Sequence, residues 1–140
     1  MMKDKFKEYF MDVAERTALL SNATKLKVGS IAVKDGRIIG CGYNGNPTGF
    51  DNICETMVNG ELVTLPTVLH AEENLIAYMA KSNESARDAI LFCNVLPCVK
   101  CSRLIIAAGF KAVYYKHMYR DDSSIEFLQQ CGIKLERIYD

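Results

Sequence analysis

Apolar side chains recur at helical spacing near the start of the chain, where Phe6, Phe10, Val13 and Leu20 would share one face. Mostly polar residues fill the positions between them. A period of about 3.6 residues is typical of an amphipathic helix. The pattern therefore predicts a first helix over residues 4–20, whose aromatic side chains pack in the core.

Two short runs rich in β-branched and other apolar residues follow, at 28–33 and 37–42. They are separated by Asp35-Gly36, a pair that tolerates positive φ and strongly favours a tight hairpin. We expect two antiparallel strands here. A turn-rich stretch over 43–49 then predicts a loop, and Asn59-Gly60 predicts a second, smaller hairpin in the connection that follows.

The rest of the chain alternates between helical and strand patterns without a repeat or linker, so we expect one domain over residues 1–140. The expected elements are helix 67–80, strand 89–94, a helix from Pro97 to Ala108, strand 111–116, helix 123–130 and strand 133–138. This order predicts an α/β fold: a three-layer α/β/α sandwich whose mixed five-stranded sheet has an N-terminal antiparallel hairpin and parallel later strands.

Composition narrows the classes of function. Of the 140 residues, 49% are apolar, and 17 basic side chains balance 17 acidic ones, so the chain lacks the cationic footprint of a nucleic-acid-binding protein. A small-molecule substrate is expected instead. No run of about 18 apolar residues and no secretory signal are found, which predicts a cytoplasmic protein with no membrane partner and with reduced cysteines.

The candidate chemistry lies in two short segments, His70-Ala71-Glu72 and Pro97-Cys98-Val99-Lys100-Cys101. One imidazole and two thiolates fill three positions of a tetrahedral zinc, and the open fourth position distinguishes a catalytic site from a structural one. Both segments fall at predicted helix starts, where backbone N–H groups and the helix dipole favour thiolates. A zinc-activated water and a nearby carboxylate together make a hydrolytic site.

Spacing alone leaves two questions open. Helical periodicity places Glu73, not Glu72, on the same side as His70. Cys98 and Cys101 could also form a redox pair in place of a metal site. A closed structural zinc would need a fourth ligand, and the remaining candidates are scattered. These are His117, Cys54, and three cysteines expected to pack as small hydrophobic residues, Cys41, Cys93 and Cys131.

The spacing His-x-Glu followed by Pro-Cys-x-x-Cys resembles the zinc-dependent cytidine and deoxycytidylate deaminase superfamily. With residues 28–33 and Gly42-Tyr43-Asn44-Gly45-Asn46-Pro47, the likeness is to deoxycytidylate deaminases and covers almost the whole chain. The resemblance implies the cytidine-deaminase-like fold, His70, Cys98 and Cys101 as zinc ligands, and Glu72 as the catalytic proton shuttle. The implied reaction converts dCMP to dUMP and ammonia and supplies dUMP for thymidylate synthesis.

Three further residues are candidates for contact with the substrate. Tyr119 stands where the family carries a substrate-contacting tyrosine, although it could also be a surface aromatic. Asn44 could hydrogen-bond the sugar or serve only as a turn residue. Lys25 stands where relatives often have arginine, and a lysine offers the phosphate a point charge without a bidentate fork.

The resemblance also implies regulation and assembly. In the family, the element Gly42, Tyr43, Asn44 and Gly45 helps form a site for the activator dCTP and the inhibitor dTTP, with Mg²⁺, in a homohexamer. The two glycines would let a nucleotide approach the backbone. Because Ala23 and Ile53 occupy the positions of a second zinc site found in some relatives, we expect one zinc per chain.

Other functions stay open at this point. A deaminase of the tRNA-adenosine type should show a basic face, which the balanced charge does not suggest, and a free-cytidine deaminase would use the same zinc chemistry. A nonenzymatic zinc module would not need Glu72. A redox protein would join Cys98 to Cys101 by a disulfide.

Overall fold

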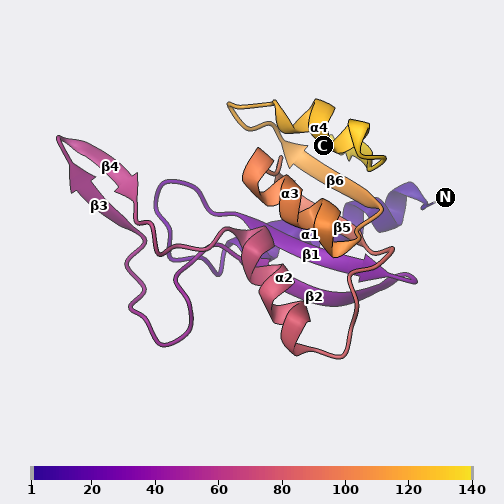
Figure 1. Ribbon diagram of the computed structural model, residues 1–140, viewed down its shortest axis with the longest axis horizontal. Helices are drawn as coiled ribbons and strands as arrows, with labels where there is room; N and C mark the ends of the chain where they lie inside the picture. Colours follow the sequence, from indigo (N-terminus) through magenta and orange to yellow (C-terminus); the bar gives the residue numbers. More distant parts are fainter. Residues whose placement is uncertain (1, 140) are drawn as a thin grey trace.

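The computed structural model describes residues 2–139, which form a five-stranded sheet covered by helices on both faces (Figure 1). The elements are α1 (Asp4–Ala18), β1 (Gly29–Lys34), β2 (Arg37–Tyr43), β3 (Glu55–Val58), β4 (Glu61–Thr64), α2 (Ala71–Lys81), β5 (Ile90–Val95), α3 (Val99–Ala108), β6 (Ala112–His117), α4 (Ser124–Gln130) and β7 (Lys134–Arg137). The strand order is β2-β1-β5-β6-β7. β1 is antiparallel to β2 and β5, whereas β5, β6 and β7 are parallel, as predicted.

Helix α1 covers one face of the sheet because its apolar stripe meets alternate residues of the central strands. Phe10, Met11 and Ala14 pack with Ile31 of β1 and Phe92 of β5 in one buried cluster. The Phe10 and Phe92 ring centroids are 5.4 Å apart. This contact confirms the core role predicted for the helix aromatics only at Phe10, because Phe6 is 46% exposed and Tyr9 is 54% exposed.

Helices α2, α3 and α4 cover the opposite face (Figure 1). Side chains that alternate with those facing α1, such as Ala32 and Leu91, pack there with Leu75 of α2, Ile105 of α3 and Leu128 of α4. The two clusters lie on opposite faces of the sheet, because successive side chains of a strand point to opposite faces. The sandwich thus holds the starts of α2 and α3 beside each other on one face.

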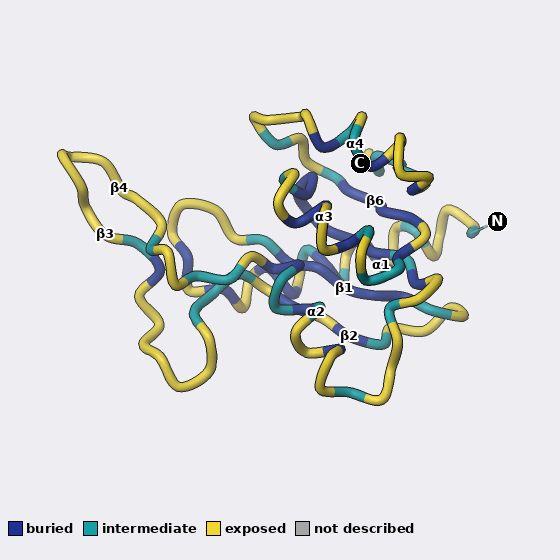
Figure 2. The backbone as a smooth tube through the Cα atoms, in the orientation of Figure 1, coloured by how far each residue is buried: buried dark blue, intermediate teal, exposed yellow. Residues whose placement is uncertain are grey.

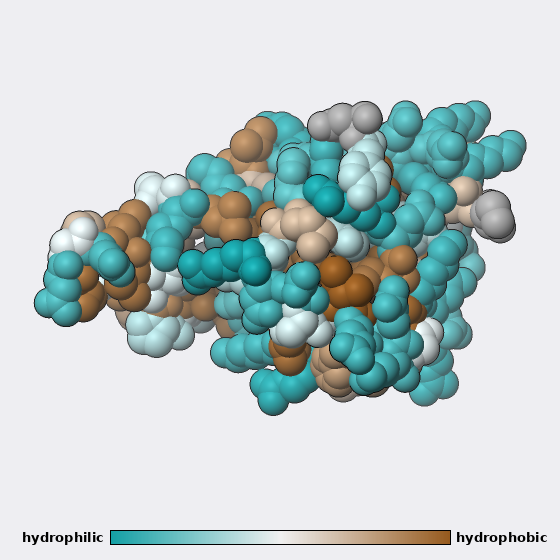
Figure 3. Space-filling view, turned by 90° about the horizontal axis from the view of Figure 1, so that it is seen from above, coloured by the Kyte–Doolittle hydropathy of each residue, from teal (hydrophilic) through white to brown (hydrophobic). Residues whose placement is uncertain are grey.

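Both predicted hairpins are confirmed by their turns. Asp35 and Gly36 have φ of 52° and 73° between β1 and β2, and Asn59 and Gly60 have φ of 51° and 80° between β3 and β4. The β3–β4 hairpin is not part of the main sheet and projects from the body of the protein (Figures 1 and 2). Its apolar side chains are largely exposed, and Figure 3 shows them gathered on this projection. They are Met57, Val58, Leu62 and Val63.

Three predictions about local structure were wrong. Helix α2 begins at Ala71 rather than at residue 67, because Leu69 pairs with Gly45 through two backbone hydrogen bonds in an isolated β-bridge. Cys41 and Cys131 are exposed and do not pack in the core, whereas Cys93 is buried as expected. Cys41 is exposed because its side chain points away from the core on the edge strand β2. Cys131 is exposed because it follows the last turn of α4.

No helix within residues 2–139 is long and apolar enough to cross a membrane.

Candidate metal centre and substrate pocket

The predicted metal ligands meet where two helices begin on the same face of the sheet. His70 is the N-cap of α2, and Cys98 is the N-cap of α3, which follows the end of β5. The Cys98 thiol accepts a hydrogen bond from the backbone N–H of Cys101 at 3.4 Å, so the cap itself orients one ligand. The expectation that both ligand groups lie at helix starts is confirmed.

The three donor atoms have the separations that one zinc ion needs. His70 Nδ1 lies 3.2 Å from Cys101 Sγ and 3.7 Å from Cys98 Sγ, and all three atoms lie within 4.8 Å of one another. Tetrahedral zinc with usual bond lengths would separate a nitrogen and a sulfur ligand by about 3.6 Å. The donor set and its spacing therefore fit zinc. With three protein ligands, a tetrahedral ion keeps one position for water or substrate.

The two thiols have opposite pKa shifts because they share a proton. A hydrogen bond from the Cys101 thiol is the main cause that lowers the pKa of Cys98, to about 4. The same hydrogen bond, together with burial, raises the pKa of Cys101. The hydrogen bond to Cys98 also raises the pKa of His70. Metal binding would replace these shared protons, since all three ligands coordinate in their deprotonated forms.

Glu72 and Glu73 occupy different environments although they are neighbours. Glu72 is only 3% exposed, and burial raises its pKa to about 7. The Glu73 carboxylate accepts a hydrogen bond from the backbone N–H of His70 at 2.8 Å. Glu73 therefore belongs to the helix cap, and Glu72 is the carboxylate that lines the cavity beside the metal ligands.

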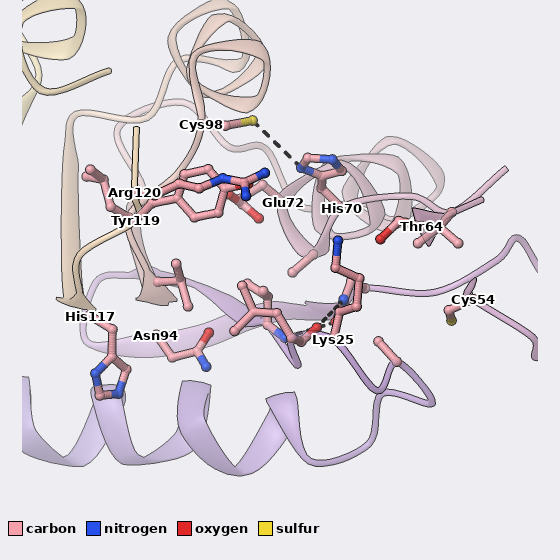
Figure 4. A pocket seen from close by; sticks show the side chains of 18 of the residues that line it. Lys25, Cys54, Thr64, His70, Glu72, Asn94, Cys98, His117, Tyr119 and Arg120 are labelled. Atoms are coloured by element: carbon pink, nitrogen blue, oxygen red, sulfur yellow. Dashed lines mark hydrogen bonds between the residues drawn. The ribbon is translucent and has the colours of Figure 1, made fainter. Parts of the chain in front are cut away.

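A cavity of about 440 Å³ connects this centre to solvent (Figure 4). Tyr119, Asn44 and Lys25, the three predicted substrate-contacting residues, all line it together with His70 and Glu72. Tyr119 comes from the segment after β6, whereas Lys25 precedes β1 and Asn44 directly follows β2. The structure thus brings together residues that are distant in the sequence.

Asn44 and Lys25 also have local roles that restrict what they offer a ligand. The Asn44 side chain accepts a hydrogen bond from Val28 N at 2.9 Å and donates one to Leu26 O at 2.8 Å. One amide hydrogen and one lone pair remain. Beside Lys25, the Glu55 carboxylate accepts hydrogen bonds from the backbone N–H groups of Thr24 and Lys25, at 2.9 and 3.2 Å.

Five polar residues that line the cavity were not predicted from the sequence to contact the substrate: Glu55, Thr64, Asn94, His117 and Arg120. Asn94 is 6% exposed and fixes the start of β1 by hydrogen bonds with Gly29 N and Lys27 O. The Nε2 atom of His117 lies 3.4 Å from Oε1 of Glu15. Arg120 is exposed beside Tyr119. Asn94 had a sequence signal as an amide within an apolar strand, and His117 had one only as a possible fourth zinc ligand.

The predicted regulatory element contains two glycines in different surroundings. A Cβ on Gly42 would lie 2.6 Å from both Ala71 O and Leu75 N, so glycine is required there for close packing of α2 against β2. A Cβ on Gly45 would meet nothing within 4 Å. Tyr43 is 39% exposed. Gly45 and Tyr43 are thus accessible to a ligand, whereas close packing against α2 explains why residue 42 is a glycine.

Comparisons with known proteins agree with this geometry. The chain is 33% identical to deoxycytidylate deaminase of Saccharomyces cerevisiae over 98% of its length, and it spans 46% of that longer protein. It is also 33% identical to deoxycytidylate deaminase of Mycobacterium phage D29, over 82% of this chain and 97% of the phage protein.

A solved structure shows the same fold throughout. The crystal structure of dCMP deaminase from the cyanophage S-TIM5, in complex with dCMP and dUMP, matches with a TM-score of 0.93 and 45% identity over 99% of this chain and all of that one. Residues 4–117 match the family described as the cytidine and deoxycytidylate deaminase zinc-binding region. The chain therefore belongs to the cytidine and deoxycytidylate deaminase family.

Proposed function

We propose that the protein catalyses the zinc-dependent hydrolytic deamination of dCMP to dUMP and ammonia. The observation that carries the proposal is the buried Glu72 carboxylate beside three metal-binding atoms in an open cavity. The deoxycytidylate deaminase relatives support the choice of substrate, as does the neighbouring structure that holds dCMP and dUMP.

In this proposal His70, Cys98 and Cys101 hold the zinc. When bound, zinc acts as a Lewis acid that lowers the pKa of water at its open position to about 7. Glu72 accepts a proton from the attacking water and delivers it to N3 of the cytosine, and it then accepts the second proton of that water and delivers it to the departing amine. A carboxyl group with a pKa of about 7 can both accept and release a proton at neutral pH.

The other walls of the cavity would bind and orient the nucleotide. Tyr119 is half-buried, so its ring can pack against the substrate while its hydroxyl donates or accepts a hydrogen bond. The remaining amide hydrogen of Asn44 can bind a sugar hydroxyl. Lys25 would contribute positive charge at the exposed end of the cavity.

Regulation by dCTP and dTTP with Mg²⁺ is a further part of the proposal. The accessible surroundings of Gly45 and Tyr43 support it, together with the intact element from Gly42 to Gly45. Under this proposal the dUMP produced supplies thymidylate synthesis in the cytoplasm, and dTTP limits its formation. Rate curves against dCMP that stay hyperbolic and unmoved by either triphosphate would remove the regulatory part.

We also propose that the protein is a homo-oligomer, a hexamer by analogy with its family. The projecting β3–β4 hairpin supports assembly, because an isolated two-stranded hairpin with exposed apolar side chains has little stability of its own. Sedimentation velocity of the purified protein tests this part. A single species with the mass of one chain, at concentrations well above those of the activity assay, would exclude it.

A substrate panel separates the proposed function from its rivals. Zinc-loaded protein is incubated with dCMP, cytidine, dCTP and a short single-stranded DNA, while ammonia and zinc content are followed. We expect ammonia chiefly from dCMP. Release only from cytidine or DNA would assign another deaminase activity, and no release from any of them would favour a nonenzymatic zinc module.

A further inference from the structure

This inference rests on the proposed function and concerns how the same cavity distinguishes a nucleotide from a nucleoside. A 5′-phosphate carries negative charge, so the charged side chains that line the cavity decide where it can bind. They are Lys25, Glu55, His70, Glu72, His117 and Arg120. His70 and Glu72 belong to the metal centre, and His117 lies against Glu15, which leaves the two walls that carry Lys25 and Arg120.

The positive charge of Lys25 is offset locally. The Glu55 carboxylate is held at the backbone of Lys25 by the N–H groups of Thr24 and Lys25, and its second oxygen lies 3.3 Å from the Thr24 hydroxyl. A phosphate at this wall would approach a fixed carboxylate as well as the ammonium group. The backbone N–H groups that could otherwise bind an anion are already used.

The wall that carries Arg120 has a different charge balance. The carboxylate of the next residue, Asp121, accepts hydrogen bonds from Ser123 N at 3.0 Å and from Ser123 Oγ at 2.7 Å. Asp121 is thus committed to the turn that precedes α4. The Arg120 guanidinium lies 5.8 Å from the centre of the Tyr119 ring, and Figure 4 shows both side chains extending toward the cavity from the segment after β6.

We propose that Arg120 binds the 5′-phosphate and sets the preference for a nucleoside monophosphate over the nucleoside. A guanidinium presents a planar pair of N–H donors that matches two phosphate oxygens, which the ammonium of Lys25 cannot do. Arg120 is exposed, so it meets the phosphate at the solvent side of the cavity while the base reaches Glu72. Arg120 is therefore a specificity-determining residue, and Lys25 has the smaller part.

Equilibrium binding of the product and of its nucleoside tests this proposal without turnover. Titration calorimetry of zinc-loaded protein compares dUMP with deoxyuridine for wild type, Arg120→Ala, Arg120→Lys and Lys25→Ala. We expect Arg120→Ala to weaken dUMP binding roughly ten- to hundredfold and to leave deoxyuridine binding within about twofold. Arg120→Lys should recover part of the loss, and Lys25→Ala should lose less than Arg120→Ala.

Arg37→Ala is the matched control, because it removes the same charge from an exposed position at the start of β2, outside the cavity. Its dUMP affinity should equal that of wild type. The proposal is overturned if Arg120→Ala binds dUMP as well as wild type does, if it loses dUMP and deoxyuridine equally, or if wild type binds dUMP no better than deoxyuridine. Absence of ammonia release from dCMP by wild type would instead refute the proposed function.

Discussion

The Glu73 carboxylate accepts a hydrogen bond from the backbone N–H of His70, so the first residue of the metal site is fixed by a side chain three positions further along α2. Such a contact satisfies a backbone donor that the helix itself cannot pair. It also holds the Glu73 side chain in the helix cap, whereas Glu72 occupies the buried position. The two neighbouring carboxylates can therefore be separated by experiment.

Glu73→Ala should lower the free energy of unfolding by about 1 kcal/mol, because it removes the partner of the His70 N–H. Urea unfolding measures the difference. Glu8→Ala, the same change on an exposed position of α1, is the control and should stay within about 0.5 kcal/mol of wild type. Equal stability of Glu73→Ala and wild type would mean that this contact contributes nothing to the cap.

Glu72→Gln should bind zinc normally and lose at least about a hundredfold in turnover, because the amide cannot carry protons between water and the base. Ammonia release and zinc per chain are measured on the same sample. The neighbouring change Glu73→Gln should keep most of the turnover. If Glu73→Gln lost turnover and Glu72→Gln kept it, Glu73 would be the proton shuttle.

Gly42→Ala should destabilise the protein by about 2 kcal/mol or more, because its methyl group would overlap the backbone of α2 at Ala71 and Leu75. The shift of α2 should also weaken zinc binding by moving His70. Gly45→Ala places the same methyl group in open space and should be close to neutral in thermal unfolding. Equal effects of both substitutions would contradict the close approach at Gly42.

The stability contributed by Asp121 should depend on pH. Hydrogen bonds from Ser123 lower the pKa of the Asp121 carboxyl below its ordinary value of 3.8. A lowered native pKa contributes stability that is present above the ordinary pKa and is lost as the pH falls through the lower native value. Asp121→Ala should therefore be less stable than wild type at pH 7, and the difference should shrink in acid.

Asp122→Ala removes an equal charge from the next residue and is the control for this pH series. Denaturant unfolding of the three proteins between neutral and strongly acid pH measures the difference. A gap between Asp121→Ala and wild type that stays constant down to the lowest pH would show that the native carboxyl is not stabilised in its charged form.

Local signals in the sequence were enough to predict where α3 begins and ends and where the β1–β2 hairpin turns. Pro97 and Gly109 bracket α3, and the left-handed φ of 97° at Gly109 shows why a glycine stands at its end. The Asp35-Gly36 turn likewise fixes the β1–β2 hairpin by its own backbone preference. These features depend on residues close together in the sequence, so their pattern can be recognised without the rest of the fold.

The remaining features depend on contacts between distant segments. Helical spacing could not choose between Glu72 and Glu73, because the choice depends on which side chain the folded sheet buries. Arg120 has no periodic pattern around it and enters the cavity only because the end of β6 lies beside β5. The packing role of Gly42 follows from α2 crossing β2, which no local pattern predicts.

The central claim is that the His70, Cys98 and Cys101 centre supports metal-dependent hydrolysis of dCMP. The most direct measurement is ammonia release from dCMP by one preparation as purified, after the metal is removed with a chelator, and after one equivalent of zinc is restored. We expect activity to disappear with the metal and to return with zinc, and we expect Cys98→Ala to regain neither zinc nor activity. Unchanged ammonia release from the metal-free protein, or none from the zinc-loaded protein, would contradict the account.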